Sequence, residues 1–374
     1  MPLYETVMQE KPPVVLDIGT AYTKLGFAAE AYPRKIIPTE FISSTNGESK
    51  NLFNYETLLE FYDQVVDFLQ MIFFKYLLVS PKDRKVVIVE NVYGQTVIRE
   101  TLAKVLFRHY EVASVLYVPS HMIALSTLAV PNGVIVDMGY AETTVMPVFS
   151  GVQILQAFQD QKYGGRDIHE VLKCLLLKEG IDSHLLTEEV LEDIKVRTCF
   201  ITKLSRAHAY AEKNPPQAPP DVQYPIADKA IITVPGHVRE EAFEIFFEEN
   251  NDRDSLPHLI LKAILGSPLD VRRILCENIF VVGGSSIVMG LLPRLKEELQ
   301  YLVANDKEYQ KRLHGDIKFK FHKCLGRANI AAWLGASLCA STDLVNSRSL
   351  TKEAYMRFEK VPDWICLDDN RVNG

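Results

Sequence analysis

The chain has 374 residues, of which 47% are hydrophobic and 24% are charged. This length exceeds what one hydrophobic core usually serves, so we expect a globular protein with two lobes. The net charge of −7 and the lack of a long apolar run argue against a general affinity for nucleic acid and against direct membrane insertion. Six scattered cysteines without a CxxC pair predict buried free thiols rather than a zinc site, and therefore a cytoplasmic protein.

Apolar runs punctuated by Gly and Pro predict strands at residues 14–19, 23–28 and 34–38. An apolar face with a period of 3.6 residues then predicts a helix over residues 55–77. Strands and helices alternate after it, with strands at 85–90, 114–119 and 133–139 and helices at 96–109 and 120–128. Such alternation predicts a largely parallel sheet covered on both faces.

The second half of the chain continues in the same style. A strand hairpin begins at residue 143, further strands are predicted at 230–235 and 278–284, and helices are predicted near 167–178 and 188–200. Between residues 214 and 225 the chain contains five prolines. Because proline disrupts helices and central strands, we predict a surface loop there.

An internal repeat is the most informative feature of the sequence. The segments VVLDIGTAYT, residues 14–23, and VIVDMGYAET, residues 134–143, share Val, Asp, Gly, Ala and Thr at a constant offset of 120 residues. Chance matches are common in apolar strands, but the shared positions here include polar residues and a turn-forming glycine. We interpret the repeat as a duplicated lobe with a site between the two copies.

In each copy an apolar strand ends in an aspartate, Asp17 or Asp137, and a glycine, Gly19 or Gly139, follows two residues later. A tight turn of this kind can direct successive backbone N–H groups at phosphate oxygens, while the carboxylate holds a water on Mg²⁺. Lys24 could add a positive charge. A single aspartate of this kind most often only stabilises its turn. The matched pair favours the phosphate site.

A third element is the segment VVGGSS at residues 281–286, although strand, glycine pair and helix follow one another in many proteins for packing reasons alone. Together with the repeats and the GGRD motif at 164–167, it resembles the actin branch of the superfamily of actins, sugar kinases and chaperone ATPases. DVRRILCENIFVVGG, AAWLGAS and SLTKEAY are similar to actin segments, and the likeness spans residues 14–355. YLLVSPKDRKVVIVE, VLEDIKVRTCF and VPDWICL are most similar to the actin-related protein 10/11 branch, which provides the pointed-end subunit of dynactin.

The resemblance implies an α/β fold: a duplicated actin-like ATPase with two lobes around a nucleotide cleft. The first lobe would comprise residues 1–132, completed by 328–374, and the second residues 133–327. ATP or ADP with Mg²⁺ is the implied cofactor, with Asp17 and Asp137 holding the metal through water. The positions that match nucleotide-binding residues of the family are Asp17, Gly19, Thr20, Lys24, Asp137, Gly139, Lys195, Gly283, Gly284 and Ser285.

Departures from the actin pattern are concentrated in catalysis. The differing positions are Ala21 and Ala141 for glycines, Tyr140 for an acidic residue, Val196 for a ribose-contacting glutamate, Asn329 for a base-stacking lysine, His121 for a water-positioning glutamine and Thr144 for its partner histidine. Hydrolysis depends on placing the water and neutralising charge, so we expect nucleotide binding with weak or absent hydrolysis, and no enzyme. His121 could replace the base, but packing or capping locally at a helix start is the commoner role.

Three function classes remain: a structural cap, an active filament-forming ATPase and a small-molecule kinase. A kinase needs a catalytic base, and no acidic residue beyond Asp17 and Asp137 is apparent near the repeats. In actins the segment after the early strands builds a small subdomain that inserts into the next subunit. Here residues 39–55 are short and polar with little room for a sheet, which predicts a reduced second subdomain and a pointed-end cap. Drift in a monomeric relative is the alternative.

The resemblance also implies partners and a location. The partners would be the subunits of an actin-like filament, the companion proteins of the dynactin pointed-end complex and, indirectly, dynein, which drives transport along microtubules. We therefore expect a cytoplasmic protein associated with the cytoskeleton.

Overall fold

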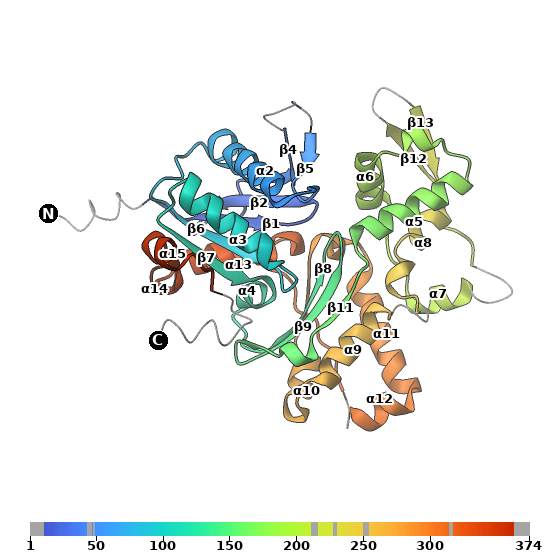
Figure 1. The fold of residues 1–374 in the computed structure, drawn as a ribbon. Coiled ribbons are helices and arrows are strands. Elements are labelled where there is room, and N and C mark those ends of the chain that lie inside the picture. The colour runs from blue at the N-terminus through green and yellow to red at the C-terminus, as the bar shows by residue number, and fades with distance from the viewer. Residues whose placement is uncertain are drawn as a thin grey trace. The chain divides into compact units, whose positions relative to one another are not determined.

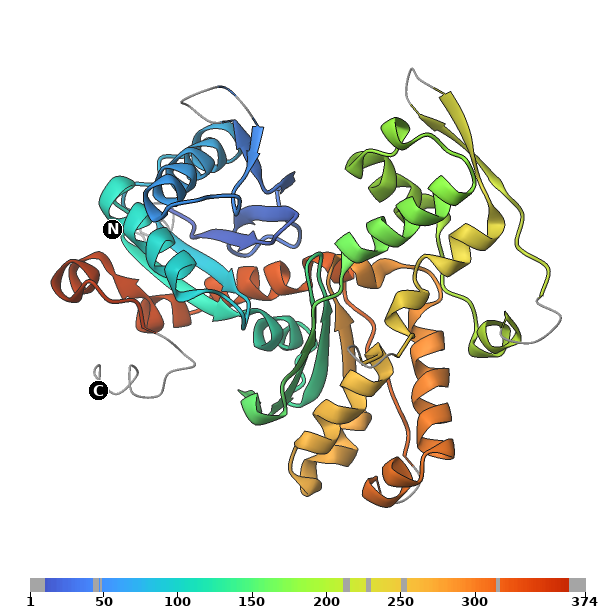
Figure 2. The same cartoon turned by 45° about the vertical axis from the view of Figure 1, so that its right-hand side comes forward.

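The computed structural model describes residues 11–42, 47, 49–210, 216–226, 230–249, 254–313 and 317–362. The chain divides into two units (Figures 1 and 2). Residues 1–127 and 330–374 form the first unit, and residues 128–329 form the second. The first unit is therefore built from two separate stretches of chain.

The first unit contains a six-stranded sheet in the order β15-β7-β6-β1-β2-β3. Its strands are β1 (Val14–Ile18), β2 (Tyr22–Phe27), β3 (Lys35–Pro38), β6 (Lys85–Glu90), β7 (Ser114–Pro119) and β15 (Leu350–Thr351). β6 and β7 are parallel, as predicted for the strands that alternate with helices, and β1 is parallel to β6. The sheet as a whole is mixed, because β2, β3 and β15 are antiparallel to their neighbours and the predicted strand at 133–139 lies in the second unit. Short turns join β1 to β2 and β2 to β3, and such short connections join antiparallel strands.

Helices cover both faces of this sheet (Figure 1). One face bears α2 (Leu58–Gln70), the π-helix η1 (Met71–Tyr76), α3 (Thr96–Lys104) and the π-helix η2 (Val105–His109). The other bears α4 (Ser120–Ser126) and α13 (Ala331–Ala340), and α14 (Leu344–Arg348) and α15 (Lys352–Phe358) follow. Val14 and Leu16 belong to the first core and Val15 to the second, as the alternation of side chains along a strand requires. Trp333 is fully buried, and its Nε1 donates to the Val15 carbonyl at 3.2 Å.

A small two-stranded sheet lies between β3 and α2. Its strands β4 (Glu40–Ile42) and β5 (Ser49–Asn51) are antiparallel, with Glu40 opposite Asn51 and Ile42 opposite Ser49. The expectation that this segment has little room for a sheet is therefore wrong, because strands of three residues suffice. Thr57 caps α2 by accepting a hydrogen bond from the Glu60 N–H, which fixes the start of the helix.

The second unit contains a sheet in the order β10-β9-β8-β14, in which β11 also pairs with β9. Its strands are β8 (Gly133–Met138), β9 (Thr143–Phe149), β10 (Val152–Gln153), β11 (Gln159–Gln161) and β14 (Ile279–Val282). β8 is antiparallel to β9 and parallel to β14, just as β1 is antiparallel to β2 and parallel to β6. The two halves of the sequence repeat thus form the same arrangement of three strands.

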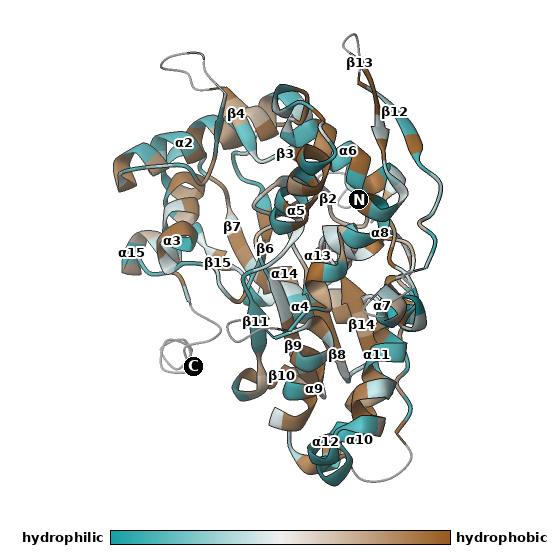
Figure 3. Cartoon of the chain, turned by 90° about the vertical axis from the view of Figure 1, so that its right-hand side faces the viewer, coloured by the Kyte–Doolittle hydropathy of each residue, from teal (hydrophilic) through white to brown (hydrophobic). Residues whose placement is uncertain are grey.

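The helices of the second unit are α5 (Gly165–Lys178), α6 (Glu188–Thr198), α7 (Leu204–Tyr210), α8 (Gly236–Glu241), α9 (Leu256–Gly266), α10 (Leu269–Cys276), α11 (Leu291–Asn305) and α12 (Lys307–Arg312). Of these, α9 and α10 pack against the sheet, whereas α6 and α8 lie on the side of the unit that carries β12 and β13 (Figure 1). Short helices η3 (Leu155–Ala157), η4 (Ser183–Leu185), η5 (Glu244–Phe246), η6 (Gly284–Ile287) and η7 (Ala328–Ile330) connect them. Ile260 and Ile264 of α9 are fully buried in the same core as Val134 and Val136 of β8. Figure 3 shows β14 as a mainly hydrophobic strand, in keeping with its burial.

The predicted proline-rich loop at 214–225 is partly wrong. Strand β12 (Val222–Ile226) pairs with β13 (Ala230–Val234) in a two-stranded sheet, and Pro225 lies opposite Ile231. A strand with only one neighbour tolerates proline, because the missing N–H need not serve a second strand. Residues 216–221 are irregular, and residues 214–215 lie outside the described part of the chain.

The described cysteines are free thiols, of which Cys199 and Cys276 are buried and Cys174 is exposed. Burial raises the pKa of Cys199 to about 11 and that of Cys276 to about 12. Cys366 lies outside the described residues.

In the part of the chain that the structure describes, every helix is too short or too polar to cross a membrane.

Candidate nucleotide site

The first turn, residues 19–21, joins β1 to β2. The Gly19 N–H donates to the Tyr22 carbonyl at 3.1 Å, and a Cβ at position 19 would lie 2.8 Å from that oxygen. Thr39 Oγ1 donates to the Gly19 carbonyl at 2.6 Å. Asp17 and Lys24 face each other across the two strands, and Lys24 Nζ lies 2.9 Å from Asp17 Oδ2. The turn therefore needs glycine at position 19 and brings Asp17 and Lys24 together.

The second turn repeats this geometry 120 residues later. The Gly139 N–H donates to the Glu142 carbonyl at 3.0 Å, and a Cβ at position 139 would lie 2.9 Å from that oxygen. Asp137 lies opposite Thr144, as Asp17 lies opposite Lys24. The two glycines are thus required for the same local reason, a close approach of the backbone to itself.

The tips of the two turns carry backbone donors. Among the described residues, the N–H groups of Thr20 and Ala21 in the first turn, and of Tyr140 and Ala141 in the second, donate no hydrogen bond. Neither alanine has a positive φ, so the replacement of glycine at these positions strains neither turn. Adjacent amide donors beside a carboxylate are the donor set that phosphate oxygens and hydrated Mg²⁺ require. The residues present fit a nucleotide with Mg²⁺, which would neutralise phosphate charge when bound.

The GGRD motif holds the second turn in place. The N–H groups of Gly165 and Arg166, at the start of α5, donate to the carbonyls of Gly139 and Tyr140 at 3.0 and 2.9 Å. A Cβ at Gly164 would lie 2.6 Å from the Tyr140 carbonyl, so the close approach requires glycine. These N–H groups therefore bind the turn.

The turn after β14 completes the cluster in the second unit. Gly283 has a φ of 96°, and a Cβ there would lie 2.4 Å from the Met138 carbonyl and 2.5 Å from Asp137 Oδ1. Ser285 Oγ donates to the Gly139 carbonyl at 3.1 Å. A Cβ at Gly284, in contrast, would meet no atom within 4 Å. Gly283 and Ser285 thus position the second turn, and Gly284 borders open space.

Lys195, on α6, is held by its own unit. It is 7% exposed, and its Nζ lies 2.6 Å from Glu192 Oε2 and 3.0 Å from His169 Nε2. Burial opposes ionisation of Glu192, but the hydrogen bond from His169 and the charge of Lys195 outweigh it and lower its pKa to about 2. Contact between Lys195 and a nucleoside remains a prediction, whereas its pairing with Glu192 is observed.

Tyr140 extends this network to the second turn. Its hydroxyl donates to Glu188 Oε2 at 3.3 Å, and its ring meets that of His169 edge-on at 5.8 Å. His169 Nδ1 lies 2.7 Å from the same Glu188 oxygen. Burial and the charge of Glu188 raise the pKa of Tyr140 to about 12. Sequence reasoning missed His169, Glu188 and Glu192, although Glu188, Glu192 and Lys195 recur with the spacing of one helix face.

The positions that correspond to catalytic residues of actin lie buried. His121 begins α4 with 1% exposure, its Nδ1 lies 3.3 Å from Ser120 Oγ, and burial lowers its pKa to about 4. Thr144 is 1% exposed on β9. Val196 and Asn329 match positions that contact the nucleoside in actin and take no part in catalysis. Val196 is 54% exposed, and the buried Asn329 Oδ1 accepts no hydrogen bond among the described residues. His121 is thus a neutral, packed histidine at physiological pH.

Comparison with known proteins agrees with these features. The family model described as Actin matches residues 8–185 and 183–361. "Actin-related protein 10" of Dictyostelium discoideum is 27% identical over 434 aligned positions, which cover 96% of this chain and 90% of that protein. The matches confirm the resemblance to actin-related proteins and the duplicated α/β fold expected from it. The chain belongs to the actin family.

Proposed function

We propose that this protein is a structural actin-related subunit that caps the pointed end of the actin-like filament of dynactin. In this role it contacts the terminal filament subunit and the companion proteins of the pointed-end complex, and it supports dynein-driven transport along microtubules. Its place is the cytoplasmic cytoskeleton. Similarity to an actin-related protein 10 over nearly the whole chain supports the assignment.

The observation that carries the cap is the small size of the segment between β3 and α2. β3 ends at Pro38 and α2 begins at Leu58, and the described residues between them contain only the three-residue strands β4 and β5. In a head-to-tail filament, one surface of each subunit must hold the next subunit. A subunit with so short an inserting segment can join a filament end but provides little for a further subunit to bind.

We also propose that the protein binds ATP or ADP with Mg²⁺ and hydrolyses it weakly or not at all. The amide donors of both turns, together with Asp17 and Asp137, support binding. The buried His121 argues against hydrolysis, because its pKa of about 4 is far from the pKa of an effective general base at neutral pH.

Purified protein should contain extractable nucleotide and release phosphate slowly. Because buried His121 stands in place of the glutamine that positions the attacking water, we expect steady phosphate release at least about a hundred-fold below that of polymerising actin. Chromatography of the acid-extracted nucleotide and a phosphate-release assay measure the two quantities. Release at the rate of polymerising actin would favour an active filament-forming ATPase instead. If the purified protein contained no nucleotide and its melting temperature did not change on addition of Mg-ATP, the proposal that it binds nucleotide would be contradicted.

A further inference from the structure

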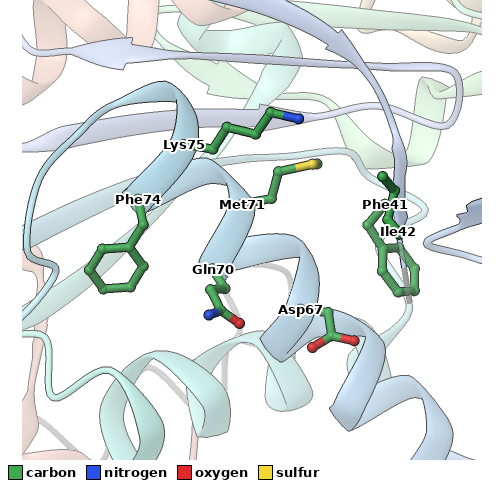
Figure 4. A pocket seen from close by; sticks show the side chains of 7 residues that line it. All are labelled: Phe41, Ile42, Asp67, Gln70, Met71, Phe74 and Lys75. Atoms are coloured by element: carbon green, nitrogen blue, oxygen red, sulfur yellow. The ribbon is translucent and has the colours of Figure 1, made fainter. Parts of the chain in front are cut away.

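Charge is distributed unevenly in the second unit. Residues 307–327 contain seven lysines and arginines but only two acidic residues, in a chain whose net charge is −7. The pocket of the first unit differs, because Asp67 and Lys75 both belong to its lining and their charges balance (Figure 4). The basic segment therefore belongs to a surface whose charge can select a partner.

Three pieces of chain form this surface, which we call the basic face: residues 269–277, 306–313 and 317–323. Helices α10 and α12 lie side by side (Figures 1 and 3), and Arg272 Nη1 donates to the Arg312 carbonyl at 3.4 Å. Just after α10, the carboxylate of Glu277 lies 2.6 Å from Lys320 Nζ and 3.7 Å from Arg273 Nε. These contacts join the three pieces into one continuous surface.

Backbone hydrogen bonds fix the extended piece of the basic face. The Lys320 N–H donates to the Cys276 carbonyl at 3.1 Å, and the Ile279 N–H donates to the Lys320 carbonyl at 2.9 Å. Phe319 is 2% exposed, so the exposed side chains of Lys318 and Lys320 point away from the core on either side of it. The Cα atoms of these two lysines are thereby held about 7 Å apart.

Positive charge on the basic face exceeds negative charge. The face contains eight lysines and arginines against four acidic residues, which gives a net charge of +4. Lys307, Lys311 and Lys318 are exposed and form no ion pair with any described residue. Lys307 and Lys311 lie four residues apart on α12, a spacing at which like charges destabilise a helix. A negatively charged partner would relieve this repulsion.

The surroundings of the basic face indicate the size of the partner. Since the chain carries −7 and the basic face +4, the remainder of the chain carries −11. A membrane surface or a long nucleic acid extends beyond the face and is repelled by this remainder. A short acidic segment of a protein is not, because it fits within the face.

Apolar side chains interrupt the basic face on α10. Leu269 and Ile274 are 62% and 39% exposed, and Ile274 follows Arg273, whose side chain is 82% exposed. Exposed apolar side chains among cations complement a segment that combines carboxylates with an apolar residue. Both the charge and the apolar surface therefore favour a protein segment.

We propose that the basic face docks an acidic segment of a partner protein. Carboxylates of the segment pair with Lys311 and Lys318, and an apolar side chain of the segment lies against Ile274. The docking does not rest on the proposed cap function or on nucleotide binding, because none of the candidate nucleotide residues belongs to the basic face.

Fluorescence anisotropy with the full chain tests this docking. One fluorescein-labelled peptide carries Glu and Asp around a single Leu, and its twin carries Gln and Asn in their place. We expect the acidic peptide to bind and the twin to bind at least about ten-fold more weakly. Lys311→Glu combined with Lys318→Glu should weaken binding of the acidic peptide at least about ten-fold. This variant should keep the melting temperature of the unchanged chain, because both side chains are exposed and unpaired.

Lys35→Glu combined with Lys178→Glu is the matched control. Both side chains are exposed, lie outside the basic face and form no ion pair with any described residue. The control and the test variant have the same net charge, so the control should bind the acidic peptide within about two-fold of the unchanged chain. Equal weakening by the two variants, or equal binding of the two peptides, would overturn the proposal.

Vesicles of phosphatidylcholine with about one fifth phosphatidylserine, and a short DNA duplex, distinguish the other classes of partner. We expect neither to bind more tightly to the unchanged chain than to the Lys311→Glu and Lys318→Glu variant. If the acidic peptide did not bind, the proposal would be wrong. Binding of vesicles or DNA that this variant abolishes would then assign the basic face to a membrane or to nucleic acid instead.

Discussion

Gly283→Val should lower the free energy of unfolding by about 4 kcal/mol, since it combines a strained backbone with a clash. The φ of 96° at Gly283 is unfavourable for every residue with a Cβ, and most of all for a β-branched one. The added Cβ would also lie 2.4 Å from the Met138 carbonyl, a backbone atom that cannot rotate away. Urea unfolding followed by circular dichroism measures the loss.

Gly284→Val provides the matched control at the next residue. A Cβ there meets no protein atom within 4 Å, so the protein should unfold at the same urea concentration as the unchanged chain. Because the resemblance to actin assigns Gly284 to the base side of the proposed nucleotide site, we expect the valine to hinder nucleotide binding. Mg-ATP at about a hundred times its dissociation constant should stabilise the unchanged chain by about 2.7 kcal/mol and this variant far less. Equal stabilisation of the unchanged chain and Gly284→Val by Mg-ATP would show that Gly284 does not border the nucleotide. Unchanged stability of Gly283→Val would contradict the backbone geometry described for Gly283.

His121→Gln should remove a strong pH dependence of stability. The pKa of buried His121 is lowered to about 4, whereas an unfolded histidine titrates near its ordinary value of 6.5. Between these values the unfolded chain binds a proton that the folded chain excludes, so folding is destabilised as pH falls from about 6.5 to 4. The contribution of His121 should reach about 3 kcal/mol at pH 4 and vanish above about pH 7.

Urea unfolding at several values between pH 7 and pH 4 measures this effect as the difference between the unchanged chain and His121→Gln. Other titrating groups are shared by the two proteins and largely cancel in the difference. His109→Gln is the control, since His109 is exposed at the surface. A stability difference for His121→Gln that stays constant across this range would show that the folded chain accommodates the protonated imidazole.

The paired turns could be predicted from the sequence because local residues determine them. A strand that ends in aspartate and is followed by glycine specifies a hairpin, and the constant offset between the two copies marks the second as an equivalent of the first. Gly19 and Gly139 both prove necessary because a Cβ would meet the carbonyl three residues further along the chain. The clash of a Cβ at Gly283 with Met138, in contrast, joins residues far apart in sequence and required the structure.

The network around Lys195 could not be predicted from single positions. His169 is 26 residues away, and its contact with Lys195 depends on how α5 packs against α6. The family resemblance indicated a nucleoside contact for Lys195, while the folded chain also supplies Glu192 as its partner. Strands β4 and β12 were missed for a different reason. β4 has only three residues, and β12 is interrupted by Pro225, so each is recognised as a strand only through its pairing with β5 or β13.

The position of the protein on a filament tests the cap most directly. Gold-labelled protein is added to preformed actin-like filaments of known polarity and located by electron microscopy, with protein alone at high concentration as the reference. We predict one label at the pointed end of each filament, no label along the sides and no filaments in the reference sample. Labels at the barbed end or along the sides, or filaments formed by the protein alone, would contradict the proposed function.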